Sequence, residues 1–166
     1  LALIDELEQR GLRDTLPDAL AVFCDLRERY PDIPLVGMEP AVKPACLHTR
    51  SGVVGVLATE RSLDGELFRR TAARYGRGIE VVTAPGKGFV ELVESDREAT
   101  PEAEECVRRA MAGMLERGAD QIVLGCTHYP FLMPVFERIV AGRDVTIIDP
   151  SPAVARRTAQ LLDQYG

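Results

Sequence analysis

The fold of this chain is decided by one stretch, Gln121-Ile122-Val123-Leu124-Gly125-Cys126-Thr127-His128-Tyr129-Pro130-Phe131-Leu132. Its apolar start shows no alternation of polar and apolar residues, which is typical of a strand buried on both faces in a parallel sheet. Gly125 permits a turn, and Pro130 suits the first turn of a helix, where its missing N–H costs nothing. The stretch therefore predicts a strand, a turn that carries Cys126, and then a helix.

The turn gathers three groups that can do chemistry. Cys126 is expected where unpaired helix N–H groups and the positive end of the helix dipole favour a thiolate. Thr127 adds a hydroxyl, and His128 adds an imidazole, a group that ordinarily titrates near neutral pH. The alternative is that Cys126 is a small buried apolar residue and His128 a surface residue. We favour a catalytic site, because open α/β sheets bind their ligands at the carboxyl ends of strands.

Length, charge and cysteine spacing narrow the class of protein. The 166 residues suit one domain with a real core. A net charge of −6 with scattered basic residues disfavours nucleic acid or an anionic membrane as partner and favours a small-molecule substrate. No apolar run could span a bilayer and no secretory segment opens the chain, so we expect a cytoplasmic protein. The cysteines form no Cys-x-x-Cys pair, so we expect free thiols and no metal at Cys24, Cys46, Cys106 and Cys126.

Strand-like and helical patterns alternate along the chain, which predicts an α/β fold: a parallel sheet flanked by helices on both faces. Strands are expected at Ile33–Met38, Val53–Thr59, Ile79–Thr83, Gln121–Cys126 and Val145–Asp149. Helices are expected at Ala19–Tyr30, Val42–Arg50, Leu63–Tyr75, Phe89–Glu94, Pro101–Arg117, Phe131–Val140 and Ala153–Leu162. The polar segment Gly11–Asp18 stands where the alternation calls for one more strand. The chain begins at Leu1, inside a helical pattern, which predicts a piece of a longer protein.

Polar residues elsewhere are predicted to reach the same edge of the sheet. Thr59 and Ser62 follow a predicted strand, and they either cradle a carboxylate or cap the next helix. Glu94 ends a short, largely apolar helix and either faces a site or is solvated. Glu39 is interpreted first as a charge at a helix N-terminus.

Five strings carry a resemblance to a known family: Gly125-Cys126-Thr127-His128-Tyr129-Pro130, Gly37-Met38-Glu39-Pro40-Ala41, Val56-Leu57-Ala58-Thr59, Leu92-Val93-Glu94 and Asp149-Pro150-Ser151. Their order and spacing closely resemble the C-terminal part of the bacterial glutamate racemases, in the aspartate/glutamate racemase superfamily. The resemblance runs from about residue 30 to the end. It implies two α/β domains with the active site between them, and neither pyridoxal phosphate nor metal.

The resemblance also implies a reaction and residue roles. In that family one cysteine thiolate removes the α-proton of glutamate and a second cysteine delivers a proton to the opposite face, which supplies D-glutamate for peptidoglycan. By this resemblance Cys126 is the second cysteine, His128 its assisting acid or base, and Glu94 the acid that tunes the site. Thr127 contacts the substrate carboxylate, with Thr59 and Ser62 beside it.

The chain departs from the family pattern in one important respect: it contains no Cys-Asn-Thr string, which carries the family's first cysteine. Cys24 or a partner chain is left as the possible second base, and Ser62 stands where the family usually has threonine. We expect residues 33–143 to form a complete α/β domain, and residues 1–32 and 144–166 to be remnants of the partner domain. Self-association is expected through apolar surface that this second domain would cover.

Two other functions compete with racemisation. One is a non-catalytic descendant that binds a small carboxylate or a partner subunit. The other is a cysteine hydrolase, which is disfavoured because residues so close in sequence as Cys126 and His128 rarely make the hydrogen bond that nucleophilic catalysis needs. The preference for glutamate over aspartate is left open.

Overall fold

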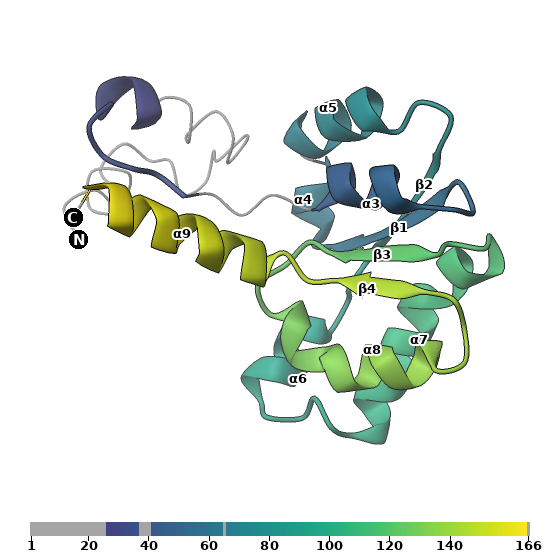
Figure 1. Cartoon of the computed structure of the whole chain (residues 1–166). Coiled ribbons are helices and arrows are strands. Elements are labelled where there is room, and N and C mark those ends of the chain that lie inside the picture. Colours follow the sequence, from purple (N-terminus) through teal and green to yellow (C-terminus); the bar gives the residue numbers. More distant parts are fainter. Residues whose placement is uncertain (1–25, 37–40, 65, 166) are drawn as a thin grey trace.

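The computed structural model describes residues 26–36, 41–64 and 66–165 of the chain. Its centre is a four-stranded parallel sheet in the order β2-β1-β3-β4 (Figure 1). The strands are β1 (Val53–Ala58), β2 (Glu80–Pro85), β3 (Gln121–Leu124) and β4 (Thr146–Ile148). The expectation of an α/β fold built on a parallel sheet is confirmed.

Helices cover both faces of this sheet (Figure 1). One face carries α3 (Val42–His48), α4 (Glu60–Asp64) and α5 (Glu66–Tyr75). The opposite face carries α6 (Phe89–Glu94), α7 (Pro101–Glu116) and α8 (Met133–Val140). A 3₁₀ turn, η1 (Tyr129–Leu132), leads from β3 into α8, and α9 (Ser151–Tyr165) follows β4.

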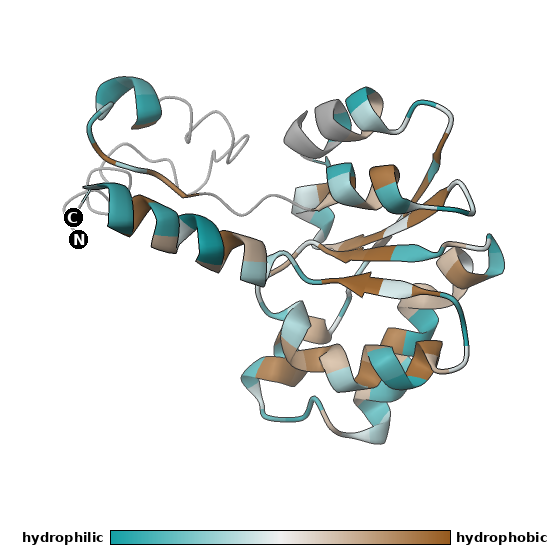
Figure 2. Cartoon of the chain, viewed as in Figure 1, coloured by the Kyte–Doolittle hydropathy of each residue, from teal (hydrophilic) through white to brown (hydrophobic). Residues whose placement is uncertain are grey.

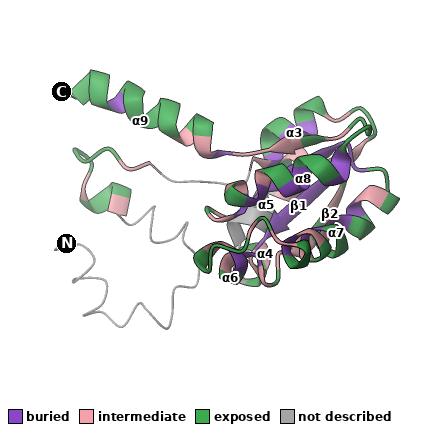
Figure 3. Cartoon of the chain, turned by 90° about the horizontal axis from the view of Figure 1, so that it is seen from below, coloured by how far each residue is buried: buried purple, intermediate pink, exposed green. Residues whose placement is uncertain are grey.

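Alternate residues of the inner strands point to opposite faces, and this explains the uniformly apolar strand sequences. Val54 and Val56 of β1 join Val123 of β3 in the cluster beneath α3. Leu57 of β1 and Leu124 of β3 join the larger cluster beneath α6, α7 and α8. The inner strands β1 and β3 are accordingly largely apolar (Figure 2) and among the most buried parts of the chain (Figure 3). Both faces of the sheet therefore exclude water, as in other parallel sheets.

The strand expected at Ile33–Met38 is not found in its described part, residues 33–36. Pro34 has no N–H to give to a ladder, and the Leu35 carbonyl accepts a hydrogen bond from the Arg27 side chain at 3.4 Å. Ile33 is left 54% exposed. An apolar run between two prolines was therefore misread as a buried strand.

The helix expected at Leu63–Tyr75 is found as α4 and α5, and residue 65 between them lies outside the described residues. The helix expected from Phe131 begins two residues earlier, as the η1 turn at Tyr129, because Pro130 is accommodated in the first turn. The predictions made for the first helical segment, for Gly11–Asp18, for Cys24 and for Glu39 lie outside the described residues.

The end of the chain extends the sheet and then leaves it. β4 lies beyond residue 143 and pairs in parallel with β3, so the sheet continues past the domain boundary expected there. α9 then runs away from the sheet and its helices (Figure 1). Most of α9 is exposed, and Leu161 is its buried residue (Figure 3). In the part of the chain that the structure describes, no helix is long and apolar enough to cross a membrane.

Candidate functional site

Cys126 lies just beyond the carboxyl end of β3, where a glycine brings it against the neighbouring strand. The Gly125 N–H donates to the Leu57 carbonyl at 2.7 Å and so extends the ladder by one residue. A Cβ on residue 125 would lie 2.9 Å from the Cβ of Ala58, which leaves no room for a side chain. Gly125 therefore allows β1 and β3 to end side by side, with Cys126 at the common edge.

The turn after Cys126 enters the helix as the sequence predicted. The Tyr129 N–H donates to the Cys126 carbonyl at 3.2 Å, which closes the turn before η1 and α8. The thiol is a partly buried free cysteine. It therefore lies near the helix start and is still open to solvent on one side, the setting in which thiols react.

Three side chains form a connected series at this edge. Cys126 Sγ lies 4.0 Å from His128 Nδ1, and His128 Nε2 lies 2.7 Å from Glu94 Oε1. Thr127 Oγ1 lies 3.4 Å from the same Nδ1. The structure thus brings together Cys126, Thr127, His128 and Glu94, which were expected at one site.

The carboxylate of Glu94 fixes which nitrogen of His128 carries the proton. A carboxylate only accepts hydrogen bonds, so Nε2–H of His128 donates to Glu94. In the neutral ring, Nδ1 is then an acceptor that faces both Cys126 and the Thr127 hydroxyl. This arrangement allows the imidazole to take the thiol proton, after which the Glu94 carboxylate stabilises the imidazolium. The distance of 4.0 Å between Cys126 Sγ and His128 Nδ1 is at the long end of hydrogen-bond contacts to sulfur.

Thr59 and Ser62 form a second polar group at the same edge. The register that pairs Leu57 with Leu124 places Thr59 level with Cys126 on the adjacent strand end. Thr59 Oγ1 lies 2.8 Å from Ser62 Oγ and accepts from the Ser62 N–H at 3.2 Å. These contacts cap α4, so the capping role is present whether or not the two hydroxyls also meet a ligand.

One residue of the site had no role in the sequence analysis, although it lies inside the decisive stretch. Tyr129 is 1% exposed, and its ring meets that of Phe89 edge to face, with the ring centroids 5.0 Å apart. Its hydroxyl lies 3.5 Å from the Gly86 carbonyl oxygen. The signal was an aromatic residue at the entry of a helix, but its partners are about forty residues away and could not be identified from local pattern.

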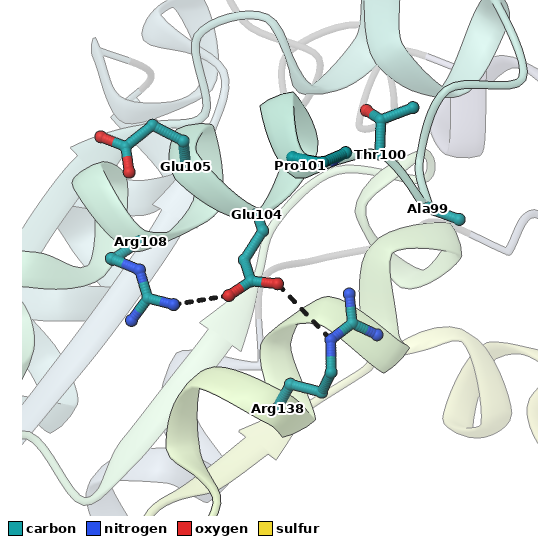
Figure 4. A pocket seen from close by; sticks show the side chains of 7 residues that line it. All are labelled: Ala99, Thr100, Pro101, Glu104, Glu105, Arg108 and Arg138. Atoms are coloured by element: carbon teal, nitrogen blue, oxygen red, sulfur yellow. Dashed lines mark hydrogen bonds and ion pairs between the residues drawn. The ribbon is translucent and has the colours of Figure 1, made fainter.

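A separate hollow lies at the start of α7, away from Cys126. Its volume is 320 Å³, and its lining comprises Ala99, Thr100, Pro101, Glu104, Glu105, Arg108 and Arg138. Glu104 points between the two arginines and pairs with both (Figure 4). The charge of Glu104 is therefore matched within the hollow itself. Among the described residues, no cluster of three His, Cys, Asp or Glu side chains could hold a metal ion.

Comparison with known proteins gives one consistent family. Residues 18–158 match the model of the Asp/Glu/Hydantoin racemase family. Glutamate racemase of Roseiflexus sp. (strain RS-1) is 47% identical over 146 residues, which cover 88% of this chain and 53% of that relative. Glutamate racemase of Pseudomonas putida (strain W619) is 48% identical over 143 residues, covering 86% and 54% respectively.

Solved structures agree with the sequence comparison. Escherichia coli glutamate racemase, in complex with L-glutamate and the activator UDP-MurNAc-Ala, superposes with a TM-score of 0.72 at 32% identity, over 84% of this chain and 52% of that one. Glutamate racemase of Thermus thermophilus, in complex with β-chloro-D-alanine, gives a TM-score of 0.60 at 26% identity, over 84% and 51%. The chain thus spans about half the length of the curated relatives it matches.

Proposed function

Because this chain belongs to the Asp/Glu/Hydantoin racemase family, we propose that it supplies one acid–base face of an enzyme that interconverts L- and D-glutamate without a cofactor. The observation that carries the proposal is the series Cys126, His128 and Glu94 at the carboxyl end of β3. A thiol next to a base that is itself oriented by a carboxylate is suited to proton transfer.

In this proposal Cys126 exchanges one proton with the α-carbon of the substrate. As a thiolate it takes the α-proton, the electron pair of the C–H bond stays on carbon, and Cys126 becomes a thiol. In the reverse direction the thiol returns the proton from the same face. Inversion needs a second donor on the opposite face, and no Cys-Asn-Thr string is present here to provide it.

His128 prepares the thiolate, and Glu94 orients His128. The Nδ1 atom that faces the thiol accepts its proton, and the carboxylate at Nε2 stabilises the positive ring that results. Glu94 is 66% exposed, which leaves its stabilising effect open to screening by solvent.

The hydroxyls of Thr127, Thr59 and Ser62 are proposed to hold the substrate carboxylate. They come from the ends of the neighbouring strands β1 and β3, and the register of these strands supports a shared binding edge. The E. coli relative binds L-glutamate, which supports an acidic amino acid as the substrate class. D-Glutamate is a component of peptidoglycan, so we assign the activity to cell-wall synthesis.

We place this reaction in the cytoplasm, and two features support that setting. The cysteines of the described part, Cys46, Cys106 and Cys126, are free thiols. A thiolate base also needs a reducing compartment to remain reduced.

The test is incorporation of solvent deuterium at the α-carbon of L- and D-glutamate, followed by mass spectrometry. A single working base exchanges the α-proton of one enantiomer and returns deuterium to the same face. We therefore expect slow exchange in one enantiomer without inversion. Cys126→Ser should abolish this exchange, whereas the matched control Cys106→Ser on α7 should retain it.

Absence of exchange in either enantiomer, together with measurable binding of glutamate, would instead support a non-catalytic carboxylate-binding protein. Exchange that survives in Cys126→Ser would remove Cys126 from the proposed role.

A further inference from the structure

The two ends of helix α6 both contact the turn that follows Cys126. At its C-terminal end, Glu94 meets His128 at 2.7 Å. At its N-terminal end, Phe89 meets Tyr129, and so does Gly86, which lies three residues before the helix. His128 and Tyr129 are consecutive, so a six-residue helix is fixed to two adjacent residues of the turn.

The contact between Gly86 and Tyr129 is a close steric fit. A Cβ on residue 86 would lie 2.5 Å from the Tyr129 hydroxyl oxygen, 2.6 Å from its Cζ and 2.7 Å from Cδ2 of Phe89. Two rigid rings therefore occupy the space that any larger residue at position 86 would need. The phenol cannot retreat readily, because Tyr129 is 1% exposed and Phe89 is fully buried.

The Tyr129 hydroxyl also remains protonated beside the thiol. Burial, together with the nearby charges of Cys126 and Glu91, raises the pKa of Tyr129 to about 12, against the opposing effect of the Gly86 carbonyl. The phenol is thus neutral at physiological pH.

We propose that Tyr129, seated against Gly86, is a positioning residue that sets the distance between α6 and the Cys126 turn and so holds Glu94 on His128. Loss of the contact between Tyr129 and Gly86 tilts α6 and lengthens the contact between Glu94 and His128. Nδ1 of His128 is then no longer fixed as the acceptor for the thiol. The significance for catalysis rests on the proposed function, but the geometric claim does not.

The test uses the full chain and two readouts that need no substrate. The chain has two histidines, so the ring ¹⁵N signals of His128 can be assigned with a His48→Gln variant. The second readout is the rate at which iodoacetamide alkylates Cys126 at pH 7, measured by mass spectrometry. Glu94→Gln provides the reference for a lost contact.

Gly86→Ala is the main variant, and its matched control is Gly113→Ala, where an added Cβ meets nothing within 4 Å. Gly86→Ala is expected to shift the His128 ring signals toward those of Glu94→Gln and to slow alkylation by about threefold, the size of one modest hydrogen bond. Gly113→Ala should match the wild type in both readouts.

Tyr129→Phe keeps the ring and removes the hydroxyl, so it should move both readouts in the same direction by a smaller amount. Tyr165→Phe on α9 should change neither. If Gly86→Ala does not fold, Tyr129→Phe alone decides the question.

A lower thermal midpoint with wild-type His128 signals and a wild-type alkylation rate would show a merely structural role and overturn the proposal. Failure of the deuterium exchange with glutamate would bear on the proposed function and leave these two readouts unaffected, so the two failures are distinguishable.

Discussion

Glu94 Oε1 lies 2.7 Å from His128 Nε2, although the two residues are 34 positions apart in the chain. The contact joins α6 to the turn after β3 and gives the imidazole a defined orientation. Glu94→Gln replaces the carboxylate by an amide of the same shape, which no longer stabilises a positive ring. We expect Cys126 alkylation at pH 7 to slow by about tenfold, a common effect of removing a partner that orients a reactive group.

The control for that substitution is Glu137→Gln, which removes one exposed acid from α8 without touching the site. Equal rates for Glu94→Gln and wild type would mean that the carboxylate does not act on the thiol through His128.

Cys126 is expected to be the most reactive thiol of the described part. It is partly open at the helix entry, whereas Cys46 is 7% exposed and burial raises the pKa of its thiol. Cys106 lies within α7 and not at a helix start. Brief labelling with iodoacetamide and peptide mapping measures the order, and preferential labelling of Cys46 or Cys106 would refute it.

At the amino ends of the strands, away from Cys126, Asp120 holds the loop before β1 in place by hydrogen bonds. Its carboxylate accepts hydrogen bonds from the Thr49 hydroxyl at 2.6 Å and from the N–H groups of Arg50 and Ser51 at 2.6 and 2.9 Å. Burial alone would raise the pKa of Asp120, but these hydrogen bonds outweigh it and lower the pKa to about 2. The folded state therefore favours the charged carboxylate.

This pKa predicts how stability depends on pH. Because the folded pKa lies below the ordinary aspartate value of 3.8, the contribution is complete above pH 4 and is lost as pH falls toward 2. We expect Asp120→Asn to lower the free energy of unfolding by about 1–2 kcal/mol at pH 7, less than the full shift because Asp120 borders an open hollow.

Urea unfolding at pH 7, 4 and 2.5 measures the difference between the wild type and Asp120→Asn, which should shrink at the lowest pH. Asp144→Asn is the control, since that carboxylate is 81% exposed in its pair with Arg50. A difference that is constant with pH would contradict the assignment.

The inner strands of this fold could be predicted because the apolar sequence of each strand by itself indicates burial. β3 is apolar on both faces, and this alone indicated a parallel sheet covered on two sides. The strand expected at Ile33–Met38 is not found in residues 33–36, because an apolar run shows only that burial is possible, not that a neighbouring strand exists to pair with it.

The site was predictable in part. Cys126, Thr127 and His128 are consecutive, so their proximity follows from the sequence. The role of Glu94 came from the family resemblance, because local pattern left even odds that it was solvated. Tyr129 received no role, since its fit against Gly86 depends on how α6 packs, a tertiary contact that no local periodicity records.

α9 predicts self-association. Leu162 and Tyr165 are 66% and 60% exposed on a helix that leaves the body of the molecule. Large exposed apolar side chains favour burial between chains. Light scattering after size exclusion should give a mass above that of the monomer, and Leu162→Glu should raise the dissociation constant by about tenfold, the value of one buried leucine.

Leu47→Glu on α3 is the control for this substitution, because Leu47 is equally exposed at 68% but lies on another face. A wild-type chain that stays monomeric at every concentration would exclude self-association through α9.

The last prediction concerns racemisation by this chain alone. Inversion requires a donor on the face opposite Cys126, and the Cys-Asn-Thr string that carries this donor in the family is absent. Loss of one acid–base partner commonly costs a factor of about 10² to 10⁴. The exposure of Glu94 also weakens the electrostatic stabilisation that the site can give, because water screens it. Circular dichroism of L-glutamate incubated with the chain should therefore show no inversion beyond that of a Cys126→Ala control. Turnover at the rate of an ordinary enzyme, lost in that control, would mean that Cys24 or a partner chain provides the second base.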